Sequence, residues 1–205
     1  MGFYTNKIFP WLLDVTEPKE MAEQRCLILR NVRGEILEIG IGTGINLPFY
    51  PENIRTLTVI DPSDAVRPRA EKRADATGRT IKWHQGRGEQ LPFDEGRFDT
   101  VVSVDVLCSV DNVDAVLRES YRVLKPGGRL HFLEHGITHE DKIRKWQIRL
   151  NSLSKVIAGG CELTRDIEKL IRDSGFIIDE FVRVSPFSGM NMLYTHIRGV
   201  AIKPV

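Results

Sequence analysis

A glycine-rich loop and a later acidic residue are the groups in this sequence best suited to binding a ligand. The loop, Gly40-Ile41-Gly42-Thr43-Gly44, directly follows an apolar segment. Glycines let the backbone turn sharply and pass close to a bound molecule. Asp61 ends the next apolar segment, where a carboxylate can accept hydrogen bonds from both ribose hydroxyls of an adenosine. The pair therefore predicts a site for an adenosine-containing cofactor.

The spacing of the glycines distinguishes between adenosine cofactors. Dinucleotide-binding loops follow G-x-G-x-x-G, whereas here the third glycine comes one residue early and Ile45 takes the last position. Glu38 precedes the loop, and its charge would repel a pyrophosphate but suit a cofactor that carries an ammonium and a sulfonium group. No G-x-x-x-x-G-K-[ST] loop is present, which disfavours an ATPase. A nicotinamide-dependent oxidoreductase and a non-catalytic cofactor-binding protein are the alternatives.

Glu134 and His135 close another apolar segment and are the candidate catalytic residues. A histidine near its ordinary pKa can take a proton from a thiol, phenol or ammonium, or hold the resulting anion. Glu134 would orient the ring or meet a substrate cation. A purely structural pair at the end of a strand is the alternative interpretation.

Alternating strand and helix patterns position all of these residues after Gly34. Such alternation predicts a Rossmann-like, doubly wound α/β fold: a mostly parallel seven-stranded sheet with helices on both faces, in one domain spanning 1–205. Ligands of such sheets lie outside the carboxyl ends of the strands. The predicted strands are Glu35–Ile39, Thr56–Ile60, Thr80–His84, Thr100–Val104, Arg129–Glu134, Phe176–Val184 and Tyr194–Ile202. The predicted helices after Gly34 are Ser63–Ala76, Asn112–Leu124, Glu140–Ile157 and Thr164–Ser174.

Local signals at the ends of elements refine this outline. Residues 1–30 predict a helical lid on the substrate side, with an aromatic start and then an amphipathic helix over Glu17–Arg30; plain core packing is the alternative. The segment Lys125–Gly128 predicts a helix stop and a turn. Thr164 predicts the N-cap of the last helix.

Several motifs in order resemble the class I S-adenosylmethionine-dependent methyltransferases, over about residues 30 to 205. They are Glu38–Gly44, Asp61, Gly86–Phe93, Phe98–Val104 and Leu124–Gly128. The resemblance implies S-adenosyl-L-methionine as cofactor and S-adenosyl-L-homocysteine as product. Arg87 departs from the family, which often has an acid there for the adenine. The implied cofactor contacts are Glu38, Gly40, Gly42, Gly44, Asn46, Asp61, Pro62, Gly88, Glu89 and Val104.

The closer resemblance is to methyltransferase-like proteins that act on alkyl thiols. It rests on Val106–Val110, Glu134-His135, Gly160–Arg165 and His196–Lys203. It implies a small, apolar acceptor, with a thiol favoured. Asn46–Pro51 also resembles bacterial lipid-amine methyltransferases, so a phospholipid or other lipid amine is the alternative acceptor. The substrate-side candidates are Tyr4, Phe9, Cys108 and Trp146, although plain apolar packing suits Cys108 better than a role as nucleophile or ligand.

Composition excludes several other classes. Lys and Arg number 29 against 28 Asp and Glu, a net charge of +1. This balance implies no strong electrostatic field that would attract nucleic acid. The three cysteines are widely spaced and form no Cys-x-x-Cys motif, so we expect neither disulfides nor a metal site, and a cytoplasmic location fits. No apolar run is long enough for a membrane span, although peripheral lipid contact stays open. We expect a monomer or a weak dimer.

Overall fold

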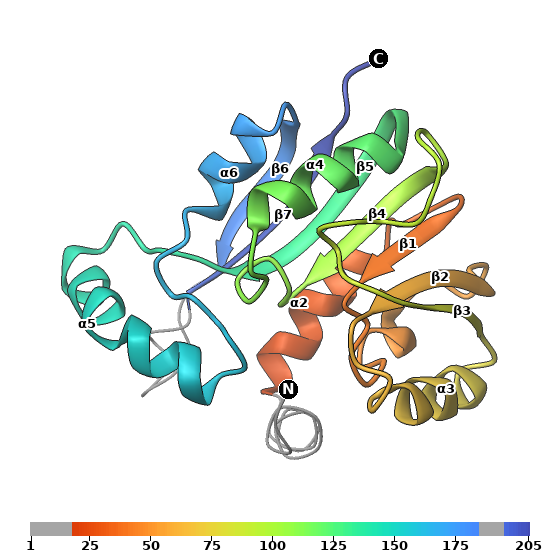
Figure 1. Cartoon of the computed structure of the whole chain (residues 1–205), viewed down its shortest axis with the longest axis horizontal. Helices are drawn as coiled ribbons and strands as arrows, with labels where there is room; N and C mark the ends of the chain where they lie inside the picture. The colour runs from red at the N-terminus through yellow and green to blue at the C-terminus, as the bar shows by residue number, and fades with distance from the viewer. Residues whose placement is uncertain (1–17, 185–194) are drawn as a thin grey trace.

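The structure is a computed structural model, and it describes residues 18–184 and 195–205. Its strands are β1 (Ile36–Ile39), β2 (Thr56–Asp61), β3 (Thr80–Gln85), β4 (Phe98–Val104), β5 (Leu124–His135), β6 (Ile177–Val184) and β7 (His196–Ile202). They form one seven-stranded sheet in the order β3-β2-β1-β4-β5-β7-β6 (Figure 1). The pairs among β1 to β5 are parallel, and β7 runs antiparallel between β5 and β6. The predicted Rossmann-like fold is confirmed.

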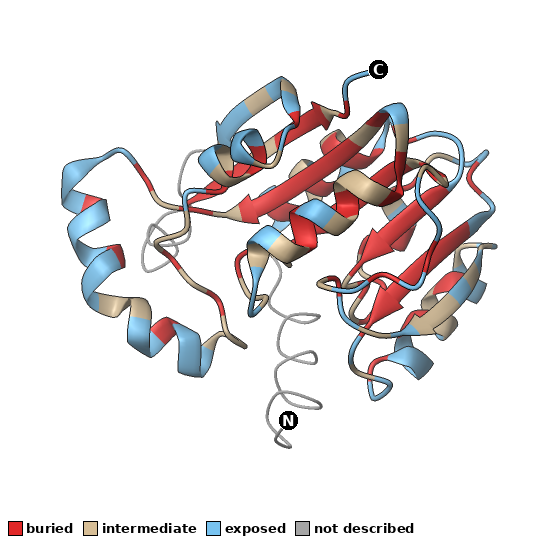
Figure 2. Cartoon of the chain, turned by 45° about the horizontal axis from the view of Figure 1, so that its top comes forward, coloured by how far each residue is buried: buried red, intermediate tan, exposed pale blue. Residues whose placement is uncertain are grey.

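Two apolar layers cover the sheet, because alternate residues of each strand point to opposite faces. The helices are α2 (Lys19–Leu29), α3 (Arg67–Ala76), α4 (Val113–Val123), α5 (Asp141–Ile157) and α6 (Ile167–Asp173), with a short 3₁₀ helix, η2 (Leu47–Phe49). α4 and α6 pack on one face through Leu117 and Ile171, and α2 and α3 pack on the other through Leu29 and Ala70. The central strands are buried on both sides, as Figure 2 shows, which is typical of parallel sheets.

Helix α5 stands apart from these layers (Figures 1 and 2). Its apolar residues Trp146, Leu153 and Val156 are 53%, 54% and 73% exposed. The buried Gln147 anchors it: its Oε1 accepts from the Thr138 N–H at 3.0 Å and its Nε2 donates to the Gly136 carbonyl at 3.1 Å. The described helices include none that is long and apolar enough to cross a membrane.

Three predicted boundaries are wrong. β5 begins at Leu124, ahead of the expected turn, because its pairing with β4 starts there and then shifts register before Arg129. Asp166, not Thr164, caps α6, since its side chain accepts from the Lys169 N–H at 3.1 Å. α3 begins at Arg67 rather than Ser63, with a proline in its first turn.

We predict that Gly199→Ala strongly destabilises the antiparallel end of the sheet. Gly199 lies on β7 between its two partners, and an added Cβ would sit 2.4 Å from the Glu180 carbonyl oxygen and 2.5 Å from Phe132 Cζ. Overpacking of this kind costs roughly 1–3 kcal/mol or more. Urea unfolding of the two proteins measures the difference.

Gly86→Ala is the matched control. Its added Cβ would meet only the flexible end of Ile60, at 3.0 Å, and its φ is not positive. Equal stability losses in the two variants would contradict the packing argument.

Candidate active site

The glycine loop is tight against the protein on one side and open on the other. A Cβ on Gly40 would lie 2.5 Å from Val106 Cγ2, and one on Gly44 would lie 3.1 Å from the Ala70 Cα. Both positions have a positive φ, as does Gly42. Residues that carry a side chain rarely adopt this backbone conformation. A Cβ on Gly42 would meet no heavy atom within 4 Å. The loop therefore packs closely through two glycines and leaves space over the third.

Asp61 ends β2 beside this open part of the loop. Its Oδ2 accepts from the Gly42 N–H and its Oδ1 from the Ser63 N–H, both at 2.9 Å. Burial raises the pKa of Asp61, although these two hydrogen bonds oppose the shift. Each carboxylate oxygen has a second acceptor position. The arrangement suits a ligand that brings hydroxyl donors.

Glu38 is fully buried at the end of β1. Asn46 Nδ2 donates to its Oε1 at 2.7 Å, and the Tyr50 hydroxyl donates to its Oε2 at 2.9 Å. Burial raises its pKa, against these two hydrogen bonds. Sequence reasoning missed Tyr50, since nothing in the sequence relates a tyrosine in the turn after η2 to a glutamate on β1.

Arg25 connects the cofactor loop with the end of β4. One terminal nitrogen donates to Asn46 Oδ1 at 2.7 Å, and the other donates to Asp105 Oδ2 at 2.8 Å. The side chain is 8% exposed. Sequence reasoning treated this helix only as an amphipathic cover, so the contribution of Arg25 was missed.

Asp105 is an acidic residue that sequence reasoning missed. It directly follows β4, much as Asp61 is the last residue of β2. An acidic residue at the end of a predicted strand was the signal that could have identified it. Its φ of 58° is unusual for a residue with a side chain. Its Oδ1 is buried without a hydrogen bond to any described residue, 3.8 Å from His135 Nε2 and 3.7 Å from His196 Nε2. Burial raises the pKa of Asp105, but the charges of Arg25 and the histidines outweigh it and lower the pKa.

Glu134 holds the segment that follows β4. Its Oε1 accepts from the Ser103 hydroxyl at 2.7 Å and from the Val106 N–H at 3.1 Å, and its Oε2 accepts from the Cys108 N–H at 3.3 Å. Burial and the charge of Asp105 raise its pKa to about 7. These contacts are those of a positioning residue.

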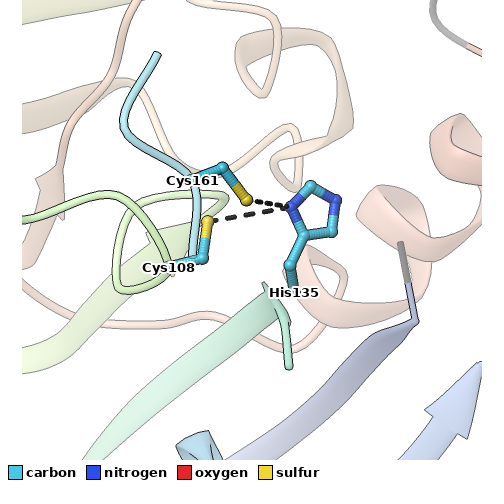
Figure 3. Close-up of side chains that lie close together, drawn as sticks. All are labelled: Cys108, His135 and Cys161. Atoms are coloured by element: carbon cyan, nitrogen blue, oxygen red, sulfur yellow. Dashed lines mark hydrogen bonds between the residues drawn. The ribbon is translucent and has the colours of Figure 1, made fainter. Parts of the chain in front are cut away.

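His135 lies against two sulfur atoms at the end of β5 (Figure 3). Its Nδ1 is 3.2 Å from Cys161 Sγ and 3.7 Å from Cys108 Sγ, and both cysteines are buried. The expectation that the cysteines and histidines form no cluster is wrong, because the fold joins residues that are far apart in sequence. Cys161 was noted only as part of a motif, and its role at the site was missed.

The charges within this cluster are coupled. A hydrogen bond with Cys108 and the neighbouring His135 hold the pKa of Cys161 well below its usual value, despite its burial. The hydrogen bond with Cys161, together with burial and the charge of the Cys161 thiolate, raises the pKa of Cys108. Burial lowers the pKa of His135, but Cys161 and Asp105 outweigh this effect and raise it to about 9. A thiolate at Cys161 and an imidazolium at His135 are therefore the favoured forms.

The adenine-side candidates form a second, smaller group. A Cβ on Gly88 would lie 2.9 Å from Ile39 Cγ2, so only glycine fits without a shift. Glu89 Oε1 accepts from the Asn112 N–H at 3.3 Å, as a turn cap would. Arg87, where the family often has an acid, forms an exposed ion pair with Asp111. Val104 is buried at the end of β4, and Pro62 is exposed directly after Asp61.

The remaining substrate-side candidates stay predictions. Tyr4 and Phe9 lie outside the described residues, as does most of the proposed lid. Trp146 is half exposed on α5, with the guanidinium of Arg149 5.5 Å from its ring centre.

Comparison with known proteins identifies the family. The methyltransferase domain family matches residues 37–132. Human thiol S-methyltransferase TMT1A is 31% identical over 97% of this chain and 87% of its own length. The chain belongs to the S-adenosylmethionine-dependent methyltransferases. Human thiol S-methyltransferase TMT1B is 32% identical over 95% of this chain and 86% of its own.

A solved structure shows the same architecture. Geranyl diphosphate methyltransferase in complex with S-adenosylmethionine aligns with a TM-score of 0.71, at 16% identity, over 98% of this chain and 91% of that one. Membership of the family makes S-adenosylmethionine the cofactor of this methyltransferase, as the resemblance of its motifs implied, and a nicotinamide-dependent oxidoreductase is excluded.

We predict that Asp61→Ala weakens the binding of S-adenosylhomocysteine by roughly 1.5–3 kcal/mol, the range for hydrogen bonds to a charged group. The loss follows from removing the carboxylate beside the open face of the loop. Titration calorimetry measures the affinity. Asp75→Ala, an exposed change on α3, is the control. Unchanged affinity in a folded Asp61→Ala protein would remove Asp61 from the cofactor site.

Proposed function

We propose that this methyltransferase transfers the methyl group of S-adenosylmethionine to the sulfur of a small, apolar thiol. The observation that carries the proposal is the acceptor-side cluster, in which His135 lies between the Asp105 carboxylate and two buried sulfur atoms. A sulfur-lined end with a cationic ring suits a soft acceptor that reacts as an anion. The similarity to human thiol S-methyltransferases over nearly the whole chain supports the same choice.

The residues around the glycine loop fit the cofactor. The open space over Gly42 admits a ligand, and Asp61 beside it offers acceptors for two ribose hydroxyls. Glu38, Asn46 and the adjoining backbone would serve the methionine portion. Gly88, Glu89, Val104 and Pro62 would frame the adenosine. When bound, S-adenosylmethionine supplies a methyl group on a positively charged sulfur, which an attacking sulfur displaces.

The protein then has three tasks at the acceptor. It must position the sulfur in line with the methyl group, exclude water and favour the anionic form of the thiol. We assign the last task to His135, because its Nδ1 lies against two sulfur atoms and the residue belongs to no cofactor motif. Asp105 would orient the ring, and Glu134 would hold the segment that carries Cys108.

An amine acceptor is the competing proposal, in the form of a phospholipid or another lipid amine. An ammonium must lose a proton and would favour a site with exposed carboxylates or aromatic faces. Here the oxygens of Glu134 are used by protein groups. A panel of thiols, amines and phenols with labelled cofactor distinguishes the acceptors. Binding of cofactor without transfer to any of them would favour a non-catalytic protein.

We predict that His135→Ala lowers the rate of thiol methylation by roughly 10²–10³-fold, the range for loss of one group that stabilises an anion in an active site, because the imidazolium would stabilise the acceptor thiolate. The affinity for S-adenosylhomocysteine should stay near normal, since His135 acts on the acceptor. Single-turnover rates and calorimetry on the same preparation give both values.

His139→Ala is the matched control, because His139 is exposed and lies four residues beyond the site. It should leave both quantities unchanged. A normal rate in His135→Ala would return this residue to a structural role. Parallel losses of rate and cofactor affinity would place it on the cofactor side.

A further inference from the structure

We propose that Cys108, His135 and Cys161 form a binding site for a zinc ion, which presents the acceptor thiol to the cofactor as a thiolate. The cysteines come from two separate segments and His135 from the end of β5, and Figure 3 shows their side chains directed at one another. The role of the ion rests on the proposed thiol methylation; the existence of the site does not.

The distances between the three ligand atoms match a zinc tetrahedron. Zinc lies about 2.0–2.1 Å from a histidine nitrogen and about 2.3 Å from a thiolate sulfur. Tetrahedral angles then place nitrogen and sulfur about 3.6 Å apart and two sulfurs about 3.8 Å apart. Here Nδ1 lies 3.2 Å from one sulfur and 3.7 Å from the other, and all three atoms lie within 4.8 Å of one another. Movements of a few tenths of an ångström would complete the geometry.

The number and kind of ligands also point to zinc. Two thiolates and an imidazole are soft donors that favour zinc over magnesium or calcium. Structural zinc sites usually have four protein ligands, whereas catalytic sites keep one position open. Among the described residues, this cluster offers three. The fourth position is available to an acceptor sulfur.

The surrounding backbone holds the two cysteine segments together. The Glu162 N–H donates to the Cys108 carbonyl at 2.8 Å. Arg165 donates to the carbonyls of Leu107 and Val110, on either side of Cys108. These bonds directly connect the Cys161 segment to the Cys108 segment, so the sulfurs are positioned before any ion arrives. Such preorganisation is what a metal site requires of its scaffold.

The second nitrogen of His135 has the partner that zinc-binding histidines usually have. Metal-bound histidines commonly direct the other ring nitrogen at a carboxylate, which fixes the ring and raises its basicity. His135 Nε2 faces Asp105 Oδ1 at 3.8 Å, and that oxygen has no hydrogen-bond partner among the described residues. A small rotation of either side chain would form the bond.

With the ion bound, zinc would favour the acceptor thiolate directly, and His135 would contribute to that task as a ligand of the ion. The S–H bond of the acceptor breaks, its proton goes to solvent, and the sulfur forms a bond to zinc in place of water. That sulfur then forms a bond to the methyl carbon as the bond from carbon to the sulfonium breaks. The neutral thioether binds zinc weakly and leaves. Coordination lowers the pKa of a bound thiol, as it does for cysteine ligands.

The test uses the full-length protein, stripped with a chelator and titrated with Zn²⁺ or with Co²⁺ as a spectroscopic probe. We expect one tightly bound ion per chain. Co²⁺ should give tetrahedral visible bands and a thiolate-to-cobalt band in the near ultraviolet. Adding an alkyl thiol should shift these bands.

Cys108→Ser and Cys161→Ser should each weaken the near-ultraviolet band, and Cys26→Ser, which changes the exposed cysteine, should not. Circular dichroism checks that every variant is folded.

Several results would overturn the proposal. Absence of stoichiometric metal would remove the site. Visible bands without the thiolate band would assign the ion to Asp105, His135 and His196 instead. A complete spectrum that thiols do not shift would make the zinc structural. Full thiol methylation by chelated protein would refute the role of zinc and leave the proposed function standing. A thiol-shifted spectrum without thiol methylation would refute the proposed function and leave the site standing.

Discussion

Buried and half-buried carboxylates at one edge of the sheet impose the main constraint on this structure. Glu38, Asp61, Asp105 and Glu134 stand at or just beyond the carboxyl ends of β1, β2, β4 and β5. An ionised group that leaves water without a partner destabilises a protein by several kcal/mol. Four such groups within one edge also repel one another. The loops and side chains around them are therefore arranged to supply donors.

Each carboxylate is satisfied in a different way, and the differences divide the site. Asp61 relies on backbone N–H groups, which leaves its remaining acceptor positions for a ligand. Glu134 is enclosed by a hydroxyl and two backbone N–H groups, so it holds the chain. Asp105 accepts a hydrogen bond from the Arg25 guanidinium at one oxygen, and its other oxygen faces His135 and His196. The proposed tasks of cofactor binding, support and acceptor chemistry would thus fall to groups of the same chemistry in different surroundings.

Arg25 couples the two halves of the site. Because its guanidinium bonds both Asn46 and Asp105, α2 cannot move without disturbing the cofactor loop and the acceptor side together. His131 adds a second attachment for the same helix, since its Nδ1 contacts the Ile28 carbonyl at 2.8 Å. The helix that precedes the glycine loop therefore contacts both halves of the candidate site.

The sequence by itself determined the fold class and the cofactor. Alternating strand and helix periods reflect local geometry, so they were sufficient for the fold class. Glu38, the glycine loop and Asp61 lie within two adjoining strand–loop units, and their spacing indicated an adenosine cofactor, which the resemblance of the motifs identified as S-adenosylmethionine. Some element boundaries were predicted wrongly. β5 begins at Leu124 because that residue pairs with β4, and α6 begins after Asp166 because Asp166, rather than Thr164, caps it.

Only the tertiary structure decided the acceptor side. Cys108, His135 and Cys161 are separated by 27 and 26 positions, and no periodicity relates them. Parallel strands bring their carboxyl ends to one edge whatever the length of chain between them. The partners of Asp105 likewise come from α2, β5 and β7. Sequence spacing therefore could not reveal a cluster that needs both the neighbouring ends of β4 and β5 and the docking of the segment between α5 and α6 against them.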